Sequence, residues 1–371
     1  RTWDLQTLFN EIHVHYQHSL QSGLMLQQEA LSKYDVLLNL QKDSKIYRPT
    51  LFDFVNHHAL AFYKTNETKI YQDLTQFHLK DEKPFALADV NIERLKFVNQ
   101  HATFSDKESI LLDALKSESE KLKSHEVSGL YDFEIASVYY TQSQQYQPIT
   151  NEDNRWKAKE AIEICNDIIS KFPESKGAEK CAVLKSQIEQ QSLQITTEDF
   201  LPIQKNARLL VRYKNLDSLQ FIIFKLQRHQ LEKFNKIYRK DEQLAFIKKL
   251  DADKNWGSSL RNENDYQTHT TEILVPKLNN GSYLVFASLE NDEDTFAFST
   301  IQVTDLALVE SDTEDYKMFQ VIDRNNGKPI SSASVELSYF RNNNRNIKRE
   351  DFTTNAYGEI KIEKDNLVIT M

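Results

Sequence analysis

The fold is decided by the stretch Tyr316-Lys-Met-Phe-Gln-Val-Ile-Asp-Arg-Asn-Asn-Gly-Lys-Pro-Ile-Ser-Ser-Ala-Ser-Val-Glu-Leu-Ser-Tyr339 and, after a polar insert, Asp351-Phe-Thr-Thr-Asn-Ala-Tyr-Gly-Glu-Ile-Lys-Ile-Glu363. Side chains alternate in character from Met318 to Asp323, which predicts a strand with one packed face. Gly327 tolerates positive φ and Pro329 cannot donate a ladder hydrogen bond, so the chain is expected to turn there.

The second half of this stretch continues the β pattern. Val335, Leu337 and Tyr339 form the next inward row, and the run from Arg341 to Arg349 reads as an exposed polar insert. Asn355-Ala-Tyr-Gly358 predicts a turn before a closing strand. The stretch therefore predicts a small sandwich of antiparallel strands.

Composition bounds the class of protein. The chain has 371 residues, 40% of them hydrophobic and 27% charged, so it is long enough for two or three globular domains. Its net charge of −9 argues against nucleic acid as a partner, because nonspecific binding to phosphates needs clustered positive charge. Only seven glycines and no G-x-x-x-x-G-K-[ST] motif argue against a nucleotide site.

No run of about 18 apolar residues occurs, so no membrane-spanning segment is predicted. The chain begins at Arg1 rather than at an initiator Met. We therefore expect a processed or partial piece of a longer protein, from which any targeting signal has been removed.

Residues 1–194 are predicted to be α-helical. Apolar residues recur there at spacings of three and four, for example between Trp3 and Leu20 and between Leu51 and Tyr63. Prolines fall where helices should end, at Pro49, Pro84, Pro148 and Pro173.

The best-defined helical unit runs from Asn151 to Leu193. An amphipathic helix from Arg155 precedes the turn Lys171-Phe-Pro-Glu-Ser175, and a return helix follows. Small residues at Ala158, Ala161 and Ala178 allow the antiparallel helices to approach closely. The pattern resembles tetratricopeptide-type helical hairpins of bacterial envelope proteins, so the region is predicted to be an irregular array of this kind.

Cys165 and Cys181 lie at similar distances on either side of that turn, so they could face each other in the hairpin. A disulfide there would stabilise the protein by about 3 kcal/mol in the chain-entropy model. An oxidising envelope compartment would permit it. Two reduced thiols buried in the core are the alternative, and the sequence leaves both open.

Residues 195–309 are predicted to form a first β-sandwich with a helical insert. Strand patterns bounded by polar turns occur at 207–213, 219–226, 268–275, 281–288 and 295–303, and a helix-compatible insert spans 230–250.

Three motifs in this region carry a resemblance to a known family. They are Leu209-Leu-Val-Arg-Tyr-Lys-Asn-Leu-Asp217, the Val-Pro-x-Leu-x-x-Gly-Ser-Tyr-Leu-Val pattern at 275–285, and Val303-Thr-Asp-Leu-Ala-Leu308. They resemble the first macroglobulin domain of bacterial alpha-2-macroglobulin-like proteins and its junction to the next domain. The stretch from 315 to 364 resembles the second macroglobulin (MG2) domain, so residues 310–371 are predicted to be a second, incomplete sandwich.

The resemblance implies a function for the whole protein. Family members inhibit proteinases by cleavage of a bait segment, conformational collapse and, where a Cys-x-Glu-Gln thioester is present, covalent capture. The cysteines here stand in Cys165-Asn-Asp-Ile168 and Cys181-Ala-Val-Leu184, so this chain holds no thioester. Its implied role is that of an N-terminal scaffold and docking part, with target proteinases as partners and the bacterial periplasm or outer membrane as its location.

A structural, partner-binding subunit of a cell-surface or outer-membrane assembly is the alternative function, because helical arrays expose extended binding surfaces. We expect no enzymatic activity, no cofactor, and no catalytic or metal-binding residues. Asp251-Ala-Asp-Lys-Asn-Trp-Gly257 resembles the start of a calcium loop, but Trp256 stands where the sharp-turn glycine belongs and Asn262 where a bidentate Glu belongs. The segment is therefore expected to be a polar loop.

Overall fold

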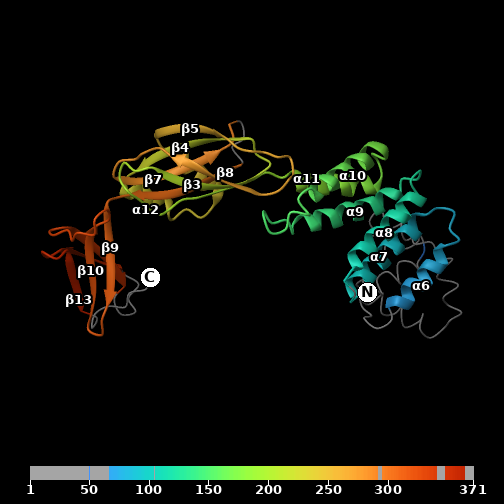
Figure 1. Cartoon of the computed structure of the whole chain (residues 1–371), viewed down its shortest axis with the longest axis horizontal. Helices are drawn as coiled ribbons and strands as arrows, with labels where there is room; N and C mark the ends of the chain where they lie inside the picture. The colour runs from blue at the N-terminus through green and yellow to red at the C-terminus, as the bar shows by residue number, and fades with distance from the viewer. Residues whose placement is uncertain (1–49, 51–66, 104, 291–294, 341–346, 364–371) are drawn as a thin grey trace, which may run out of the picture. The chain divides into compact units, whose positions relative to one another are not determined.

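The computed structural model describes residues 50, 67–103, 105–290, 295–340 and 347–363 (Figure 1). These residues form two compact units. The helical unit ends at Gln190 and also includes Asn264–Gln267, whereas the β unit contains the other described residues from Gln191 onward. The helices predicted between Trp3 and Tyr63 lie outside the described residues.

The described part of the helical unit consists of helices joined by short connections. Pro84 immediately precedes one of them, and another ends at Lys171, two residues before Pro173, so these two predicted breaks are confirmed. Neighbouring helices pack on each other in sequence order. Their bounds are α6 Glu67–His78, α7 Phe85–His101, α8 Lys107–Lys121, α9 Ser128–Ser143, α10 Lys157–Lys171 and α11 Lys176–Glu189.

The predicted hairpin is confirmed as α10 and α11. Ser175 caps α11 by accepting a hydrogen bond from the backbone N–H of Ala178 at 3.1 Å. Ala158 and Ala161 of α10 are fully buried in one cluster with Ala178 of α11, which agrees with the close approach expected from small side chains. The further likeness to tetratricopeptide repeats stays a prediction.

The first sandwich of the β unit is built from two sheets. One has the strand order β1-β3-β6 and the other β2-β8-β7-β4-β5, and all pairs are antiparallel except β2 with β8. The strands are β1 Ser192–Thr196, β2 Phe200–Leu201, β3 Ala207–Lys214, β4 Ser218–Leu226, β5 Ala252–Ser259, β6 His269–Val275, β7 Gly281–Ser288 and β8 Phe296–Val303.

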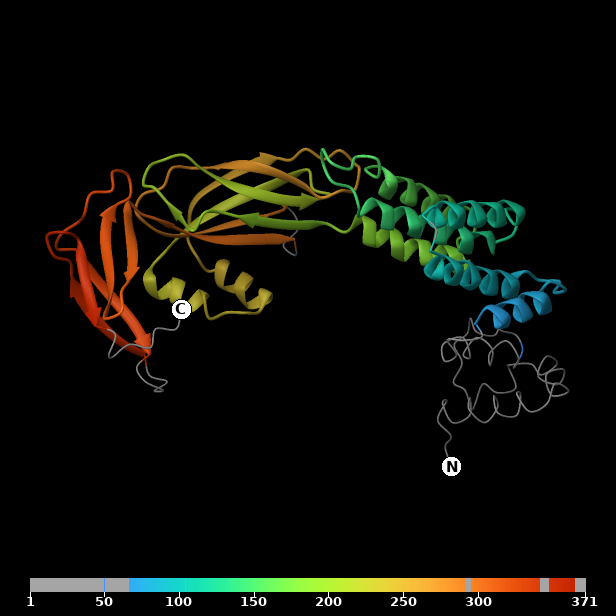
Figure 2. The same cartoon turned by 60° about the horizontal axis from the view of Figure 1, so that its bottom comes forward.

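Strand β7 shows why this domain has three layers. Tyr283 and Val285 pack into the core between the two sheets, whereas Leu284 and Phe286 pack on the opposite face of their sheet. That second face is covered by the predicted helical insert, which forms α12 (Arg228–Phe234) and α13 (Lys240–Ile247) (Figure 2). A strand buried on both faces reads as a continuous apolar run, as this one does.

The prediction of a polar loop at Asp251–Gly257 is wrong. Residues 252–259 form the edge strand β5, which pairs with β4 along its length. Most of its side chains are exposed, so the strand lacks the alternation that would have indicated it. Trp256 is the exception, because its ring stacks on Phe221 with centroids 5.0 Å apart.

The second sandwich pairs a sheet of order β13-β10-β9 with the two-stranded sheet β11-β12. The predicted turn is confirmed, since the side-chain oxygen of Asn355 accepts hydrogen bonds from the backbone N–H groups of Tyr357 and Glu359. The end of the predicted polar insert is a strand instead, because residues 347–353 pair with β11. The strands are β9 Leu306–Asp312, β10 Tyr316–Asp323, β11 Ser334–Phe340, β12 Ile347–Thr353 and β13 Glu359–Glu363.

The predicted fold class, a helical region followed by antiparallel β-sandwiches, is thus confirmed. The three domain boundaries at 194, 309 and the end of the chain stay predictions.

Candidate protein-binding groove of the helical unit

Helices α9 and α11 are not consecutive in the chain, yet they pack on each other. Two glycines make the contact possible. A Cβ atom on Gly177 would lie 2.5 Å from the backbone carbonyl carbon of Gly129, which is closer than a Cβ can approach. Glycine at this crossing therefore sets how near the two helices come to each other.

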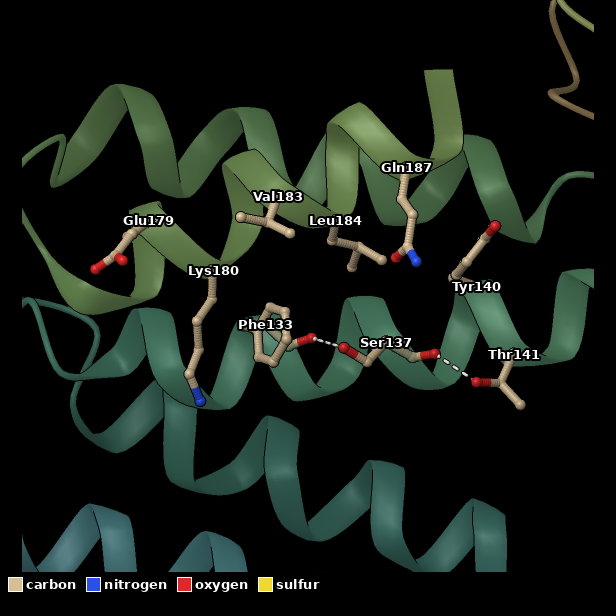
Figure 3. Close-up of a pocket in the computed structure, with 9 residues that line it drawn as sticks. All are labelled: Phe133, Ser137, Tyr140, Thr141, Glu179, Lys180, Val183, Leu184 and Gln187. Atoms are coloured by element: carbon tan, nitrogen blue, oxygen red, sulfur yellow. Dashed lines mark hydrogen bonds between the residues drawn. The ribbon is translucent and has the colours of Figure 1, made fainter. Parts of the chain in front are cut away.

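Beyond the crossing, the two helices line a groove of about 380 Å³ (Figure 3). The lining side chains recur at helical spacings of three and four, which places them on one face of each helix. They are Phe133, Ser137, Tyr140 and Thr141 on α9, and Glu179, Lys180, Val183, Leu184 and Gln187 on α11. We name this set the α9–α11 groove.

Two hydroxyl groups of the groove donate hydrogen bonds within α9. Ser137 donates to the backbone oxygen of Phe133, and Thr141 donates to the backbone oxygen of Ser137, both at 2.9 Å (Figure 3). On the opposite wall, Val183 leaves 66% of its surface exposed. The groove thus presents mainly apolar surface to solvent, although its lining includes polar residue types.

Lys180 supplies the one cation among the groove residues, and its Nζ lies 5.1 Å from the centre of the Phe133 ring. Among the described residues, no carboxylate comes within 4.0 Å of this ammonium group. Glu179 is paired elsewhere, because its carboxylate lies 3.0 Å from Lys176. The positive charge at this end of the groove is therefore not neutralised by a salt bridge in the described part of the chain.

The nearest buried acid on α9 is already engaged. Burial raises the pKa of Glu134, while the positive charges of Lys96 and Lys180 act in the opposite direction. Lys96 forms the closer contact, with its Nζ 3.7 Å from the Glu134 carboxylate.

The structure brings together the two cysteines that the sequence singles out. Cys165 and Cys181 are both fully buried in the cluster between α10 and α11, and both are free thiols. The neighbouring Cys165 thiol, together with burial, raises the pKa of Cys181. The facing arrangement expected from the hairpin is therefore present, whereas the disulfide itself stays a prediction.

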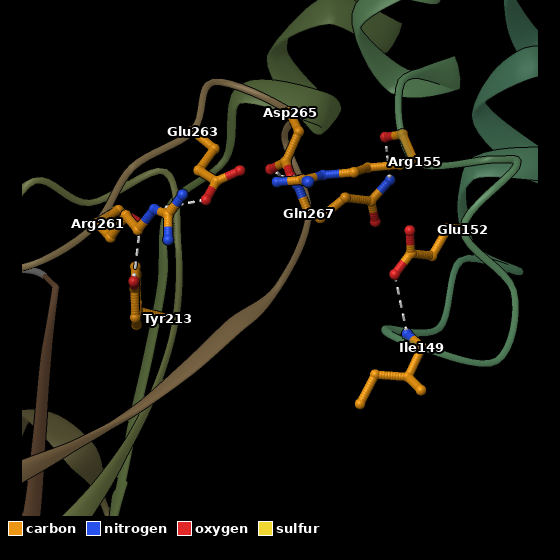
Figure 4. A network of polar contacts seen from close by, with 8 residues as sticks. All are labelled: Ile149, Glu152, Arg155, Tyr213, Arg261, Glu263, Asp265 and Gln267. Carbon is orange, nitrogen blue, oxygen red and sulfur yellow. Dashed lines mark hydrogen bonds and ion pairs between the residues drawn. The ribbon is translucent and has the colours of Figure 1, made fainter.

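A short clasp holds Asn264–Gln267 within the helical unit (Figure 4). Arg155 Nε donates to the carboxylate of Asp265 at 2.9 Å, and the side-chain amide of Gln267 donates to the backbone oxygen of Arg155 at 3.0 Å. The Asp265 side chain is only 1% exposed, and its carboxylate also accepts a hydrogen bond from the backbone N–H of Gln267 at 3.1 Å. Tyr266 adds an apolar contact to the cluster around α10 and α11.

Within the described ranges, no group of three or more His, Cys, Asp or Glu side chains is arranged to hold a metal ion. No helix in those ranges is both long and apolar enough to cross a bilayer.

Sequence reasoning did not single out the α9–α11 groove. The one feature of the sequence that could have indicated this groove is Val183, an aliphatic residue close to Lys180 on the outer face of an amphipathic helix. The groove depends on the contact between helices that are not neighbours in the sequence, and a hairpin pattern does not specify that contact.

Comparison with solved structures returns parts of a bacterial alpha-2-macroglobulin. A native Escherichia coli fragment spanning domains MG0-NIE-MG1 is 17% identical, with a TM-score of 0.35, and the match covers 47% of this chain and 57% of that fragment. A fragment spanning NIE-MG1 is 14% identical, with a TM-score of 0.35 and coverage of 48% and 88%. The native conformation of the E. coli protein is 13% identical, with a TM-score of 0.28, and the match covers 11% of its length.

A scan against family models and a search of curated proteins both returned no match. The solved structures that this chain is similar to include fragments of a bacterial alpha-2-macroglobulin, and the sequence motifs resemble the same family.

Proposed function

We propose that this chain is the N-terminal scaffold and docking part of a bacterial envelope alpha-2-macroglobulin-like proteinase inhibitor. The observation that carries the proposal is the agreement between motifs and strands. The motif at 209–217 covers most of β3 and the turn to β4, the motif at 275–285 covers the connection from β6 to β7, and the stretch from 315 to 364 contains β10 to β13.

In this proposal the chain is not an enzyme. The resemblance implies that the whole protein is cleaved in a bait segment by the attacking proteinase and then closes on it. Because this chain holds no Cys-x-Glu-Gln sequence, any covalent capture would use residues outside it. The sandwiches would serve as rigid spacers, and the helical unit would serve as a docking part.

The α9–α11 groove favours a second function of another class. An apolar groove with an unneutralised cation is the kind of surface by which a subunit of a cell-surface or outer-membrane assembly binds its partner. Such a role needs no bait segment and no thioester.

The proposed envelope location also gives the cysteines a role. Both thiols lie in the same buried cluster between α10 and α11, which is the arrangement that a disulfide across this hairpin requires. In an oxidising compartment, thiol–disulfide exchange with a protein that carries a reactive disulfide would join Cys165 to Cys181 and leave that protein with two reduced thiols.

The test uses the complete gene product, incubated with an endoproteinase. Residual activity is measured on a large protein substrate and on a small peptide substrate. Trapping predicts that activity on the protein substrate is lost while activity on the small peptide persists. This chain on its own is the control and should inhibit neither activity.

Methylamine treatment then separates the two functions. Release of one free thiol from the complete product would support covalent capture. A complete product that lacks both Cys-x-Glu-Gln and any proteinase-sensitive segment would rule out trapping and leave the assembly role.

A further inference from the structure

We propose that the α9–α11 groove binds an extended peptide segment of a partner protein in which an acidic side chain stands next to large aliphatic or aromatic ones. The inference rests on the docking role proposed above and names the chemistry of the partner. Shape, hydrogen-bonding capacity and charge support it separately.

The shape of the groove suits a few side chains. Its volume of about 380 Å³ lies near the lower end of the roughly 300–1,000 Å³ typical of ligand sites. Phe133 is half-buried on the α9 wall, Val183 is 66% exposed on the α11 wall, and the buried Leu184 lies beneath them. Covering these side chains with aliphatic or aromatic groups removes apolar surface from water, which drives association.

The hydrogen-bonding capacity of the groove suits a peptide backbone. The hydroxyls of Ser137 and Thr141 already donate to carbonyls of their own helix. Gln187 is different, because within the described residues no hydrogen bond is made by its side-chain amide. A primary amide can both donate and accept, so it can pair with one peptide group of an extended segment.

The charge of the groove selects an acidic neighbour. Lys180 forms no salt bridge with a described carboxylate, and it lies over Phe133 at one end of the apolar surface. A carboxylate brought there would form a charge-assisted hydrogen bond at the edge of an apolar contact. A basic segment would instead place like charges together, so the groove discriminates between the two.

The experiment measures binding of two fluorescent peptides to the whole chain by anisotropy. One peptide has the sequence Gly-Ser-Glu-Leu-Phe-Leu-Glu-Ser-Gly, and the other has both Glu residues replaced by Lys. We expect saturable binding of the Glu peptide, about tenfold tighter than that of the Lys peptide. The preference should weaken as salt is added, because the charges lie near the surface.

Two lysine variants on the same helix provide the matched comparison. Lys180→Ala should weaken binding of the Glu peptide about tenfold and leave binding of the Lys peptide unchanged or slightly tighter. Lys185→Ala removes the same charge from a residue that contacts Asn166 and Glu189 rather than the groove, so binding should not change. Val183→Ser should weaken binding of both peptides, because it removes apolar surface from the groove. Circular dichroism of all variants reports whether the fold is retained.

The inference is overturned if neither peptide binds saturably, if both bind equally, or if the two lysine variants behave alike. Self-association of the chain that the Glu peptide reverses would assign the groove to a second copy and also overturn the inference. Failure of peptide binding together with intact proteinase trapping would remove this inference alone and leave the proposed function standing.

Discussion

Replacement of Gly177 by alanine probes the contact that forms the α9–α11 groove. The added methyl group would lie 2.5 Å from the carbonyl carbon and 2.7 Å from the carbonyl oxygen of Gly129. Both are backbone atoms inside a helix, so no side-chain rotation can relieve the overlap. The helices must separate at the crossing.

Two opposing effects set how much stability Gly177→Ala loses. Alanine is the better helix former by about 1 kcal/mol. Overpacking costs about 1–3 kcal/mol where side chains can adjust, and the backbone contact here places the cost at or above about 3 kcal/mol. The net loss for Gly177→Ala is therefore about 2 kcal/mol, or a fall in Tm of about 4–8 °C.

Differential scanning calorimetry of the whole chain measures this loss, and Gly129→Ala provides the comparison. Its methyl group would meet Cγ2 of the buried Ile168 at 2.8 Å, so this variant is also destabilised, but the overlap is with one side-chain atom rather than with backbone atoms. We expect Gly129→Ala to lose less stability than Gly177→Ala, and only the latter to weaken the Glu peptide strongly. A Gly177→Ala variant as stable as the native chain, or more stable than Gly129→Ala, would refute the reasoning.

Three further outcomes are expected. If Cys165 and Cys181 form a disulfide, a reductant should lower the free energy of unfolding by about 3 kcal/mol. The double Cys→Ala variant should not respond to the reductant. Free thiols at both positions in non-reducing mass mapping would contradict the disulfide. Denaturant unfolding should show that Gly358→Ala lowers the free energy of unfolding by about 2 kcal/mol more than Gly327→Ala does. Both glycines have positive φ, but only at Gly358 would the added methyl group lie 2.5 Å from a backbone oxygen. Equal losses would contradict this expectation. Burial raises the pKa of Glu134 above its ordinary 4.5, so the folded chain keeps the Glu134 carboxyl protonated to higher pH than the unfolded chain does. The contribution of Glu134 to the free energy of unfolding should therefore fall as pH rises from about 4.5 through the pKa of the folded state. Denaturant unfolding across that range should show a flatter profile for Glu134→Gln, and an unchanged profile would contradict the assignment.

Local patterns explain which parts of the fold could be predicted. The α10–α11 hairpin follows from Pro173, the capping Ser175 and small side chains, all within one short segment. The five predicted strands of the first sandwich follow from alternation or from apolar runs, because their side chains meet either the opposite sheet or α12 and α13. They are β3, β4, β6, β7 and β8.

Two of the missed strands, β5 and β12, share a physical cause. β5 is an edge strand and β12 belongs to a two-stranded sheet, and most side chains described in both are exposed. Their hydrogen bonds come from the backbone, which carries no sequence signal. The β5 segment therefore looked like a polar loop.

The groove was unpredictable for a different reason. It requires α9 to contact α11 at Gly129 and Gly177, across the intervening α10. Neither glycine is in a turn, and a glycine inside a helix gives no indication of which distant backbone it approaches. The cysteine pair was easier to place, because one hairpin determines its geometry.

The most direct test of the docking role is a double-mutant cycle. Binding free energies of the Glu peptide and of a neutral peptide with both Glu residues replaced by Gln are measured for the native chain and for Lys180→Ala, which isolates the interaction between this lysine and the acidic side chains. The account predicts a coupling free energy of about 1 kcal/mol or more that shrinks with added salt. A coupling of zero would contradict the claim that the groove recognises an acidic segment through Lys180.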